Sequence, residues 1–204
     1  MLYKFAHILQ DKLPFIWDAI EWMNATLFVF RYGENLKCIP TILNKYSDSF
    51  QLRQATLSDI DNLIRFFQKQ PKESYEYFKP HEFDTQTIKK LIERRSYLFF
   101  IVLDNQKIVG YYFLRSFFMG KSYLGKLVDE GYRGRGIGKL MCLSAMNIAT
   151  SIGLHMYETI SKDNLASLYS SQKVLDVKVI EEMDNNYIYV EDFPKGTLTK
   201  TNDL

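Results

Sequence analysis

The first fifty residues carry apolar side chains at helical spacing. These side chains follow one another at alternating steps of three and four positions: Ala6, Leu9, Leu13, Ile16, Ile20, Met23, Leu27 and Phe30. Such spacing predicts an apolar stripe along a helix. Because proline is tolerated in the first turn of a helix and not inside it, Pro14 separates a short helix from a longer one over residues 14–31, which Gly33 ends. Trp17 and Trp22 lie off the stripe, so this helix packs within the protein, forms a dimer contact or rests at a membrane interface.

The middle of the chain alternates between helical and extended patterns. Two amphipathic helices are predicted, one that Ser58 caps and Pro71 ends, and one over residues 85–95. Runs of β-branched and aromatic residues on either side of a polar turn at 104–106 predict a hairpin, and a further strand leads into a glycine-rich turn and a helix that Gly153 ends. The predicted strands lie at residues 97–103, 107–117 and 123–128. This order predicts a mixed α/β domain.

Length and charge narrow the classes of function. The 204 residues suit one domain with an appendage. Since 26 Lys and Arg are balanced by 24 Asp and Glu, the chain has no surplus of positive charge with which to hold a nucleic acid, and no nucleic-acid partner is expected. Aromatic residues make up 15% of the chain, so many rings must be buried or bind a ligand.

The setting of the protein is expected to be cytoplasmic. Two cysteines are too few for a disulfide scaffold, and the first residues do not resemble a secretory signal. Residues 13–30 are interrupted by Asp18, Glu21 and Asn24, whereas a helix that spans a membrane needs about 20 predominantly apolar residues. A spanning segment is therefore not predicted, and neither is a metal site.

The glycine-rich turn carries the strongest chemical signal. It reads Arg133-Gly-Arg-Gly-Ile-Gly-Lys139 between a strand and a helix. Alternate glycines allow a ligand to approach the backbone and direct successive N–H groups toward one anion at a helix N-terminus, where the dipole favours each negative group by about 0.3–1 kcal/mol. With the cations Arg133, Arg135 and Lys139, the turn predicts a pyrophosphate site.

Two common nucleotide motifs do not match. The spacing Gly134-x-Gly136-x-Gly138 differs from the G-x-G-x-x-G of dinucleotide-binding folds. The sequence Gly120-Lys-Ser has Arg115 at the position of the first glycine of a P-loop.

The turn resembles the signature [RQ]-x-x-G-x-[GA] of the GNAT superfamily of acyl-CoA-dependent acyltransferases. Arg133-Gly-Arg-Gly136-Ile-Gly138 matches every specified position. The resemblance covers about residues 50–193 and includes a first strand and helix entry at 53–59, a hairpin around Gly110, and a fifth strand and next helix from Leu154 to Ser167. It divides the chain into an N-terminal helical extension (1–49), the acyltransferase-like domain (50–193) and a polar tail (194–204).

The resemblance implies a GNAT-like α/β fold, with a mixed sheet that is flanked by helices and splayed between its fourth and fifth strands, and acetyl-CoA in the split. By position, the cofactor-binding residues are Leu127, Val128, Arg133, Gly134, Arg135, Gly136, Ile137, Gly138, Lys139 and Asn164. Asn164 also suits a helix N-cap, and the two roles are compatible.

The resemblance further implies attack of an amine on the thioester carbonyl, stabilisation of the oxyanion by a backbone N–H, and departure of the thiolate. Many family members have a proton-donating tyrosine seven residues after the asparagine, where this chain has Ser171; Tyr169 is an alternative donor. The fourth strand offers no carboxylate, so the remaining candidate bases are Glu158 and His155 on the fifth strand and His81, Glu82 and Asp84 in the loop of residues 74–84. Glu158 suits a paired residue at the edge of the core equally well, and His81 suits a loop hydrogen bond.

The acceptor is predicted to bind the aromatic loop of residues 74–84, which combines flat rings with His81, Glu82 and Asp84. An amino sugar or sugar nucleotide fits these groups first, and a peptide N-terminus or a polyamine fits them as well. A module that binds acetyl-CoA or a protein partner without catalysis is the alternative from another class.

Overall fold

The computed structural model describes residues 14–183 and 186–198 of the chain. Its centre is a seven-stranded mixed sheet in the order β1-β2-β3-β4-β5-β7-β6. The strands are β1 (Gln51–Gln54), β2 (Tyr97–Asp104), β3 (Lys107–Ser116), β4 (Lys121–Val128), β5 (His155–Ser161), β6 (Leu175–Met183) and β7 (Tyr187–Pro194). The α-helices are α2 (Pro14–Tyr32), α3 (Ile39–Lys45), α4 (Ile60–Lys69), α5 (Thr85–Glu93), α6 (Ile137–Ile152) and α7 (Leu165–Gln172).

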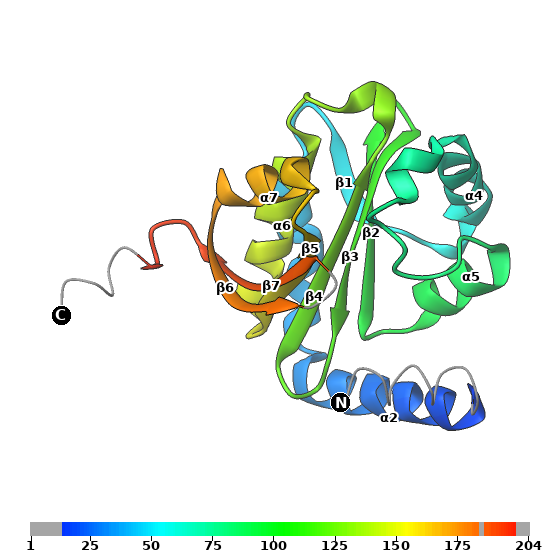
Figure 1. The fold of residues 1–204 in the computed structure, drawn as a ribbon. Helices are drawn as coiled ribbons and strands as arrows, with labels where there is room; N and C mark the ends of the chain where they lie inside the picture. The colour runs from blue at the N-terminus through cyan, green and yellow to red at the C-terminus, as the bar shows by residue number, and fades with distance from the viewer. Residues whose placement is uncertain (1–13, 184–185, 199–204) are drawn as a thin grey trace.

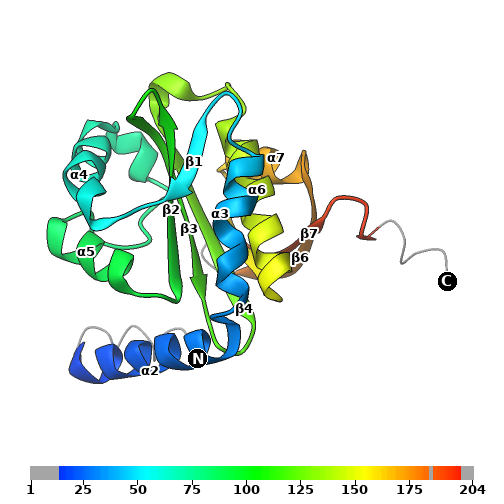
Figure 2. The same cartoon turned by 180° about the vertical axis from the view of Figure 1, so that it is seen from behind.

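Helices cover both faces of the sheet, with α4 and α5 on one side and α3 and α6 on the other (Figures 1 and 2). Strand β2 shows the reason, because its side chains alternate between two cores. Leu98 and Phe100 pack with residues of α3 and α6, whereas Phe99 and Ile101 pack with residues of α4 and α5. A strand that is buried on both faces reads as a continuous apolar run, which is the pattern of residues 97–103.

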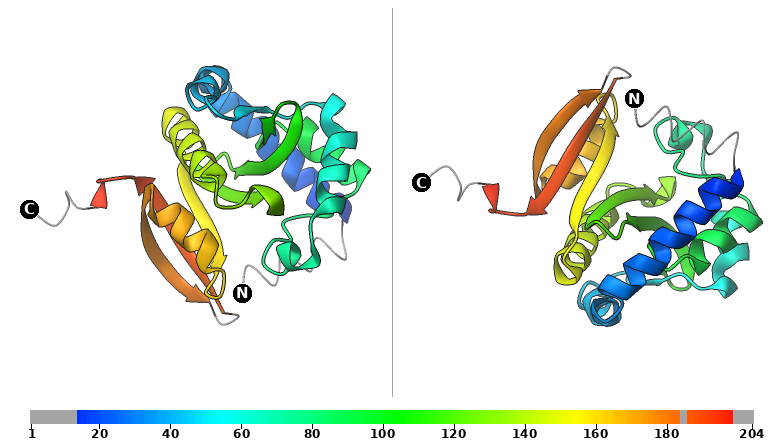
Figure 3. Two further views of the ribbon diagram at one scale, coloured as in Figure 1. Left: turned by 90° about the horizontal axis from the view of Figure 1, so that it is seen from above. Right: turned by 90° about the horizontal axis from the view of Figure 1, so that it is seen from below.

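The sheet divides into two parts at β4 and β5. These strands are parallel, and their register holds for three residue pairs, from Lys121↔His155 to Tyr123↔Tyr157. Beyond this point β4 continues beside β3 as far as Val128, and β5 continues beside β7 as far as Ser161. The view along the strands shows β5 turning away from β4 (Figure 3). The predicted splay is therefore confirmed.

Helix α2 lies across the end of the sheet at the β3–β4 turn (Figure 1). The amide of Asn24 donates to the carbonyl of Ser116 at 3.0 Å and accepts from the N–H of Phe118 at 3.1 Å. The buried Glu21 carboxylate pairs with Arg94 at 3.2 Å and with Arg115 at 2.5 Å. These polar contacts fix the helix to the domain. None of the helices in the described part of the chain is long and apolar enough to cross a membrane.

Most predicted elements are confirmed. Residues 14–31 form α2, the hairpin is β2 and β3, and α6 ends at Gly153 with a φ of +91°. The predicted helix before Pro14, with the first residues of the apolar stripe, lies outside the described residues.

The predicted cap at Ser58 is wrong. Thr56 and Asp59 form a capping box before α4, since Asp59 accepts from both the N–H and the hydroxyl of Thr56. Arg53 makes two 2.7 Å contacts with the same carboxylate and lowers the pKa of Asp59 to about 2. The Asp59 carboxylate, whose charge Arg53 stabilises, is a stronger hydrogen-bond acceptor for the groups at the start of the helix than the Ser58 hydroxyl is.

Candidate active site

The glycine-rich turn opens α6 in the conformation that an anion site needs. Gly134 and Gly136 have φ values of +78° and +85°, and Gly136 is the N-cap residue of the helix. A Cβ atom at either position would point into open space, so the backbone here is free to be approached. The N–H groups of Ile137 and Gly138 belong to the first helical turn, where no carbonyl of the helix can reach them. The turn therefore fits a pyrophosphate.

Two arginines of the turn are held in place. The guanidinium of Arg133 donates to the hydroxyl of Ser74 at 2.6 Å, which ties the turn to the short helix Lys72–Tyr75. Arg135 lies 4.6 Å above the ring of Tyr132. Both arginines are exposed, so their charges are available to a ligand at the surface.

The edge of β4 that faces β5 has no strand partner over residues 124–128, as far as the structure describes the chain. Leu127 and Val128 lie on this stretch and pair on their other side with Tyr111 and Gly110 of β3. The open edge begins directly below the glycine-rich turn. It is where the resemblance places the pantetheine arm.

A buried polar cluster spans the split beside this edge. Lys126 of β4 contacts the carboxylate of Glu158 on β5, and its Nζ lies 3.0 Å from Oγ of Ser171 on α7. The Ser171 hydroxyl donates to Oε1 of Glu158 at 2.7 Å. Cys142 of α6 lies 3.6 Å from the same hydroxyl. Four elements thus meet at one charged centre.

Asp192 of β7 adds a second acid to this cluster. It is buried, and neither of its carboxylate oxygens has a hydrogen-bond partner. Burial, and then repulsion from Glu158, raise the pKa of Asp192 to about 8, so that the group holds a proton at neutral pH. Burial by itself would lower the pKa of Lys126, but the neighbouring carboxylate of Glu158 raises it above its usual range. The lysine therefore stays charged.

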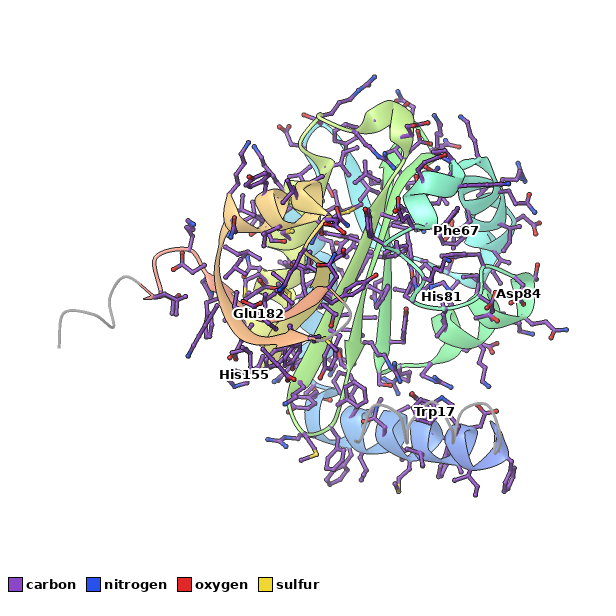
Figure 4. The ribbon with its side chains drawn as sticks, in the orientation of Figure 1. Trp17, Phe67, His81, Asp84, His155 and Glu182 are labelled. Carbon is purple, nitrogen blue, oxygen red and sulfur yellow. The ribbon has the colours of Figure 1, made fainter. Side chains whose placement is uncertain are left out.

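The structure brings together two of the four predicted catalytic residues, Glu158 and Ser171. Tyr169 also lies on α7 but is 57% exposed, away from the cluster. His81 lies on the other face of the sheet, against Phe67 and near α5 (Figure 4).

Two further predicted site residues have structural partners. The ring nitrogens of His81 contact the hydroxyl of Tyr111 and the carbonyl of Glu82, both at 2.7 Å, and burial lowers the pKa of His81 to about 4. Asn164 caps α7, with its Oδ1 accepting from the N–H of Ser167 at 3.2 Å.

The aromatic loop is largely part of the core. Phe78 and Phe83 pack against the α4 and α5 core, and Tyr75 donates to the carbonyl of Phe67. Asp84 caps α5 through the N–H groups of Gln86 and Thr87. These side chains hold the loop in place and leave few groups for an acceptor.

A set of tyrosines at the point where β4 and β5 begin to part offers flat faces instead. Tyr157 and Tyr189 stack at 5.3 Å between ring centres, and Tyr123 lies 5.9 Å and 6.2 Å from them. The hydroxyls of Tyr123 and Tyr189 are 3.3 Å apart. We name Tyr123, Tyr157 and Tyr189 the tyrosine wall. By strand alternation it lies on the face of β4, β5 and β7 opposite Glu158.

The chain is similar to known proteins both in its sequence and in its fold. Residues 60–172 match the acetyltransferase (GNAT) family. No curated protein matches the chain. Among solved structures, the PaiA N-acetyltransferase of Thermoplasma acidophilum in complex with coenzyme A is 18% identical, with a TM-score of 0.59 over 71% of this chain and 98% of that one.

Two other solved structures share the fold. YncA of Salmonella typhimurium, a putative acetyltransferase with its cofactor acetyl-CoA, is 17% identical with a TM-score of 0.55, covering 71% of this chain and 92% of its own. The ribosomal-protein-S5-alanine acetyltransferase of Vibrio fischeri is 15% identical with a TM-score of 0.58, covering 73% and 95%.

A splayed mixed sheet with an anion cradle at the end of β4 defines an acyl-CoA-dependent acyltransferase. The chain belongs to the GNAT family, and acetyl-CoA is its cofactor.

Proposed function

We propose that the protein is an N-acetyltransferase that acts on a primary amine of a small polar acceptor, with an amino sugar or a sugar nucleotide as the first candidate. The observation that carries the catalytic part is the buried cluster of Lys126, Glu158 and Ser171 inside the split, next to the glycine-rich turn. A buried acid, a cation and a hydroxyl within hydrogen-bond reach of one another are the groups that proton transfer requires.

The residues proposed to hold the cofactor are those of the turn, the free edge of β4 and the cap of α7: Leu127, Val128, Arg133, Gly134, Arg135, Gly136, Ile137, Gly138, Lys139 and Asn164. When bound, acetyl-CoA supplies the activated acetyl group. The open edge of β4 offers backbone N–H and C=O groups to an extended ligand, as an unpaired strand edge does.

Glu158 is proposed as the group that takes up the proton of the acceptor amine at its carboxylate. Because the tyrosine wall lies on the opposite face of the sheet, the amine must reach Glu158 through the open split between β4 and β5. Ser171 lies between Lys126 and Glu158, so its hydroxyl can accept from Nζ while it donates to a neighbour. In this proposal the Ser171 hydroxyl, backed by the positive charge of Lys126, takes the role that a tyrosine has at this position in many family members. Lys126 thereby offsets negative charge that develops on the leaving group.

The acceptor preference rests on the tyrosine wall and on Tyr77. The rings of the wall are half-buried and present flat faces, on which the apolar face of a sugar ring can pack while its hydroxyls reach the phenol groups. Tyr77 lies in the loop on the other side of the split, and desolvation, then the charges of Glu76 and of Asp163 after β5, raise its pKa. The loop and the end of β5 therefore lie close together at the mouth.

A protein N-terminus is the second candidate acceptor. The observation that favours it is the similarity of the fold to the ribosomal-protein-S5-alanine acetyltransferase. A mouth lined with tyrosines also suits an extended peptide, since such rings make both apolar and hydrogen-bonded contacts.

The test is a thiol-release assay with purified protein and acetyl-CoA across amino sugars, sugar nucleotides, peptides and polyamines, together with calorimetric titration of acetyl-CoA. Glu158→Gln should lower kcat by about 10²–10⁴-fold and leave acetyl-CoA binding within a few-fold of wild type. Glu181→Gln, an exposed acid on β6, is the matched control and should retain full activity. Tight cofactor binding without turnover on any amine would show a binding module instead of an enzyme.

A further inference from the structure

The outer face of α2 is apolar, and no side chain among residues 14–183 and 186–198 covers it. Its central positions hold small residues, Ala19 and Thr26, which are also exposed. Seven large apolar side chains on this face are exposed: Phe15, Ile16, Ile20, Trp22, Met23, Leu27 and Phe30. At 100° per residue they cover an arc of roughly 160° that contains no charged residue. Asp18 and Arg31 lie at its two borders.

The size of this face matches a protein interface. Phe15, Trp22 and Phe30 are 84%, 70% and 92% exposed, which corresponds to roughly 500 Å² of aromatic surface. The four aliphatic side chains bring the face to roughly 800 Å², which is the area that each partner of a standard interface buries. The largest patch on a typical monomer is smaller than this.

The spacing of the exposed residues indicates that the partner is another helix. Ile16, Ile20, Met23, Leu27 and Phe30 keep the steps of four and three residues that bring a stripe of side chains against a second helix. The residues that pack on the domain are a different set, with Glu21, Asn24 and Phe28 at its centre. The stripe predicted from the sequence therefore faces away from the domain that the helix belongs to.

We propose that this face binds the same face of a second copy of the chain, with the two α2 helices antiparallel and the two-fold axis crossing the exposed face at the height of residues 24 and 25. In this register Phe30 of one copy lies opposite Ala19 of the other, and Met23 lies opposite Thr26. In these two pairs a large side chain of one copy lies against a small residue of the other, whereas Trp22 meets Leu27 as an apolar pair, so the face is complementary to itself. The helix is already fixed by Glu21 and Asn24, so little order is lost when the copies meet.

The dimer leaves both active sites open. Helix α2 lies at the end of the sheet opposite the glycine-rich turn, because β4 runs from one end to the other (Figure 1). The inference is independent of the acceptor and of the catalytic residues.

Sedimentation velocity of the full chain over a concentration series, without acetyl-CoA, tests the proposal. We expect a dimer at micromolar concentration, and Phe30→Glu should weaken association by roughly 30-fold or more, as loss of an interface hot spot does. Val179→Glu, at an exposed apolar position of β6, is the matched control and should leave the dimer unchanged. Because both substitutions lie on the surface, far-UV circular dichroism should match wild type.

Cross-linking tests the register. In a Cys38→Ser background, Met23→Cys combined with Thr26→Cys should form an oxidised dimer faster than either cysteine alone, since paired helices bring these positions within disulfide reach. A wild-type chain that stays monomeric at 100-fold higher concentration, or a Phe30→Glu variant that still dimerises, overturns the proposal. Flotation of a monomer with anionic phospholipid vesicles, abolished by Phe30→Glu, would overturn it in favour of a lipid surface.

Discussion

Replacement of Lys126 by methionine should destabilise the fold more than replacement of its acidic partner. The side chains of Lys126 and Glu158 are 8% and 4% exposed, so each charge is stabilised by the other side chain and not by solvation in water. Methionine preserves the length and volume of the lysine chain and removes its charge. The variant leaves the carboxyl groups of Glu158 and Asp192 near each other without a cation.

The magnitude follows from the burial. Removal of one member of a buried ion pair costs about 3–5 kcal/mol, which corresponds to a fall in Tm of about 6–20 °C for a chain of this size. Glu158→Gln should cost about 1–2 kcal/mol, because the amide oxygen still accepts from Ser171, and because loss of the repulsion from Glu158 lets Asp192 give up its proton and balance the charge of Lys126. The expected result is an asymmetry between the two partners of one pair.

Urea unfolding at neutral pH, followed by circular dichroism, measures both losses and that of the double variant. The double variant should lose less than the sum of the single ones, because the two side chains interact directly. Lys121→Met, on the exposed end of the same strand, is the control and should change the free energy of unfolding by less than about 0.5 kcal/mol. A loss below about 1 kcal/mol for Lys126→Met, or equal losses for the two single variants, would refute the reasoning.

Three further predictions concern protons and the glycine-rich turn. The folded state raises the pKa of Asp192 to about 8, so its contribution to stability is lost as pH rises from about 4 through 8, and Asp192→Asn should flatten the fall in Tm between pH 5 and pH 8. Burial lowers the pKa of His81 to about 4, so this residue contributes stability that is lost as pH falls from about 6.5 through 4. His81→Gln should therefore reduce the difference in Tm between pH 7 and pH 4.5, which corresponds to up to about 3 kcal/mol in the free energy of unfolding. An unchanged difference would contradict the buried position of His81. Gly136→Glu should abolish acetyl-CoA binding in calorimetry, because a side chain and a negative charge would enter the anion site, whereas Gly153→Ala, at the same positive φ at the other end of α6, should cost stability and retain binding.

The fold could be predicted from the sequence in those segments whose local pattern fits a single type of secondary structure. The apolar runs that became β2 and β3, and the strand, glycine turn and helix from β4 to α6, combine periodicity with a turn or cap. Helix α3 was not predicted, because its seven residues are too few to show a period. Strands β6 and β7 were not predicted either, although Tyr187, Tyr189 and Glu191 alternate with buried residues in a pattern that the sequence does contain.

The conformation of the glycine-rich turn could be predicted from the sequence, because the spacing of its glycines sets the backbone at the start of α6. The role of residues 133–139 in holding the cofactor stays a prediction. The cluster around Glu158 needs four elements to meet, and no local pattern encodes such a meeting. Lys126 offered a signal all the same, as a charge in the otherwise apolar run Leu-Gly-Lys-Leu-Val. The aromatic loop had two interpretations, because rings that suit a ligand also suit a core; here Phe83 packs against Phe67, which also contacts Tyr111, and the acceptor role of the loop stays a prediction.

The short ladder between β4 and β5 has a consequence for how the protein opens. With three residue pairs between these strands, β5, β6, β7 and α7 form a unit with a small core of its own, made of Ile160, Ile188 and Val190. We expect native-state hydrogen exchange to show this unit opening at a lower free energy than β2 and β3, as separate cooperative units of one fold do. A ligand that fills the split then acts as a clamp between the two units, so its binding should slow exchange in β5 and β7 far more than in β2.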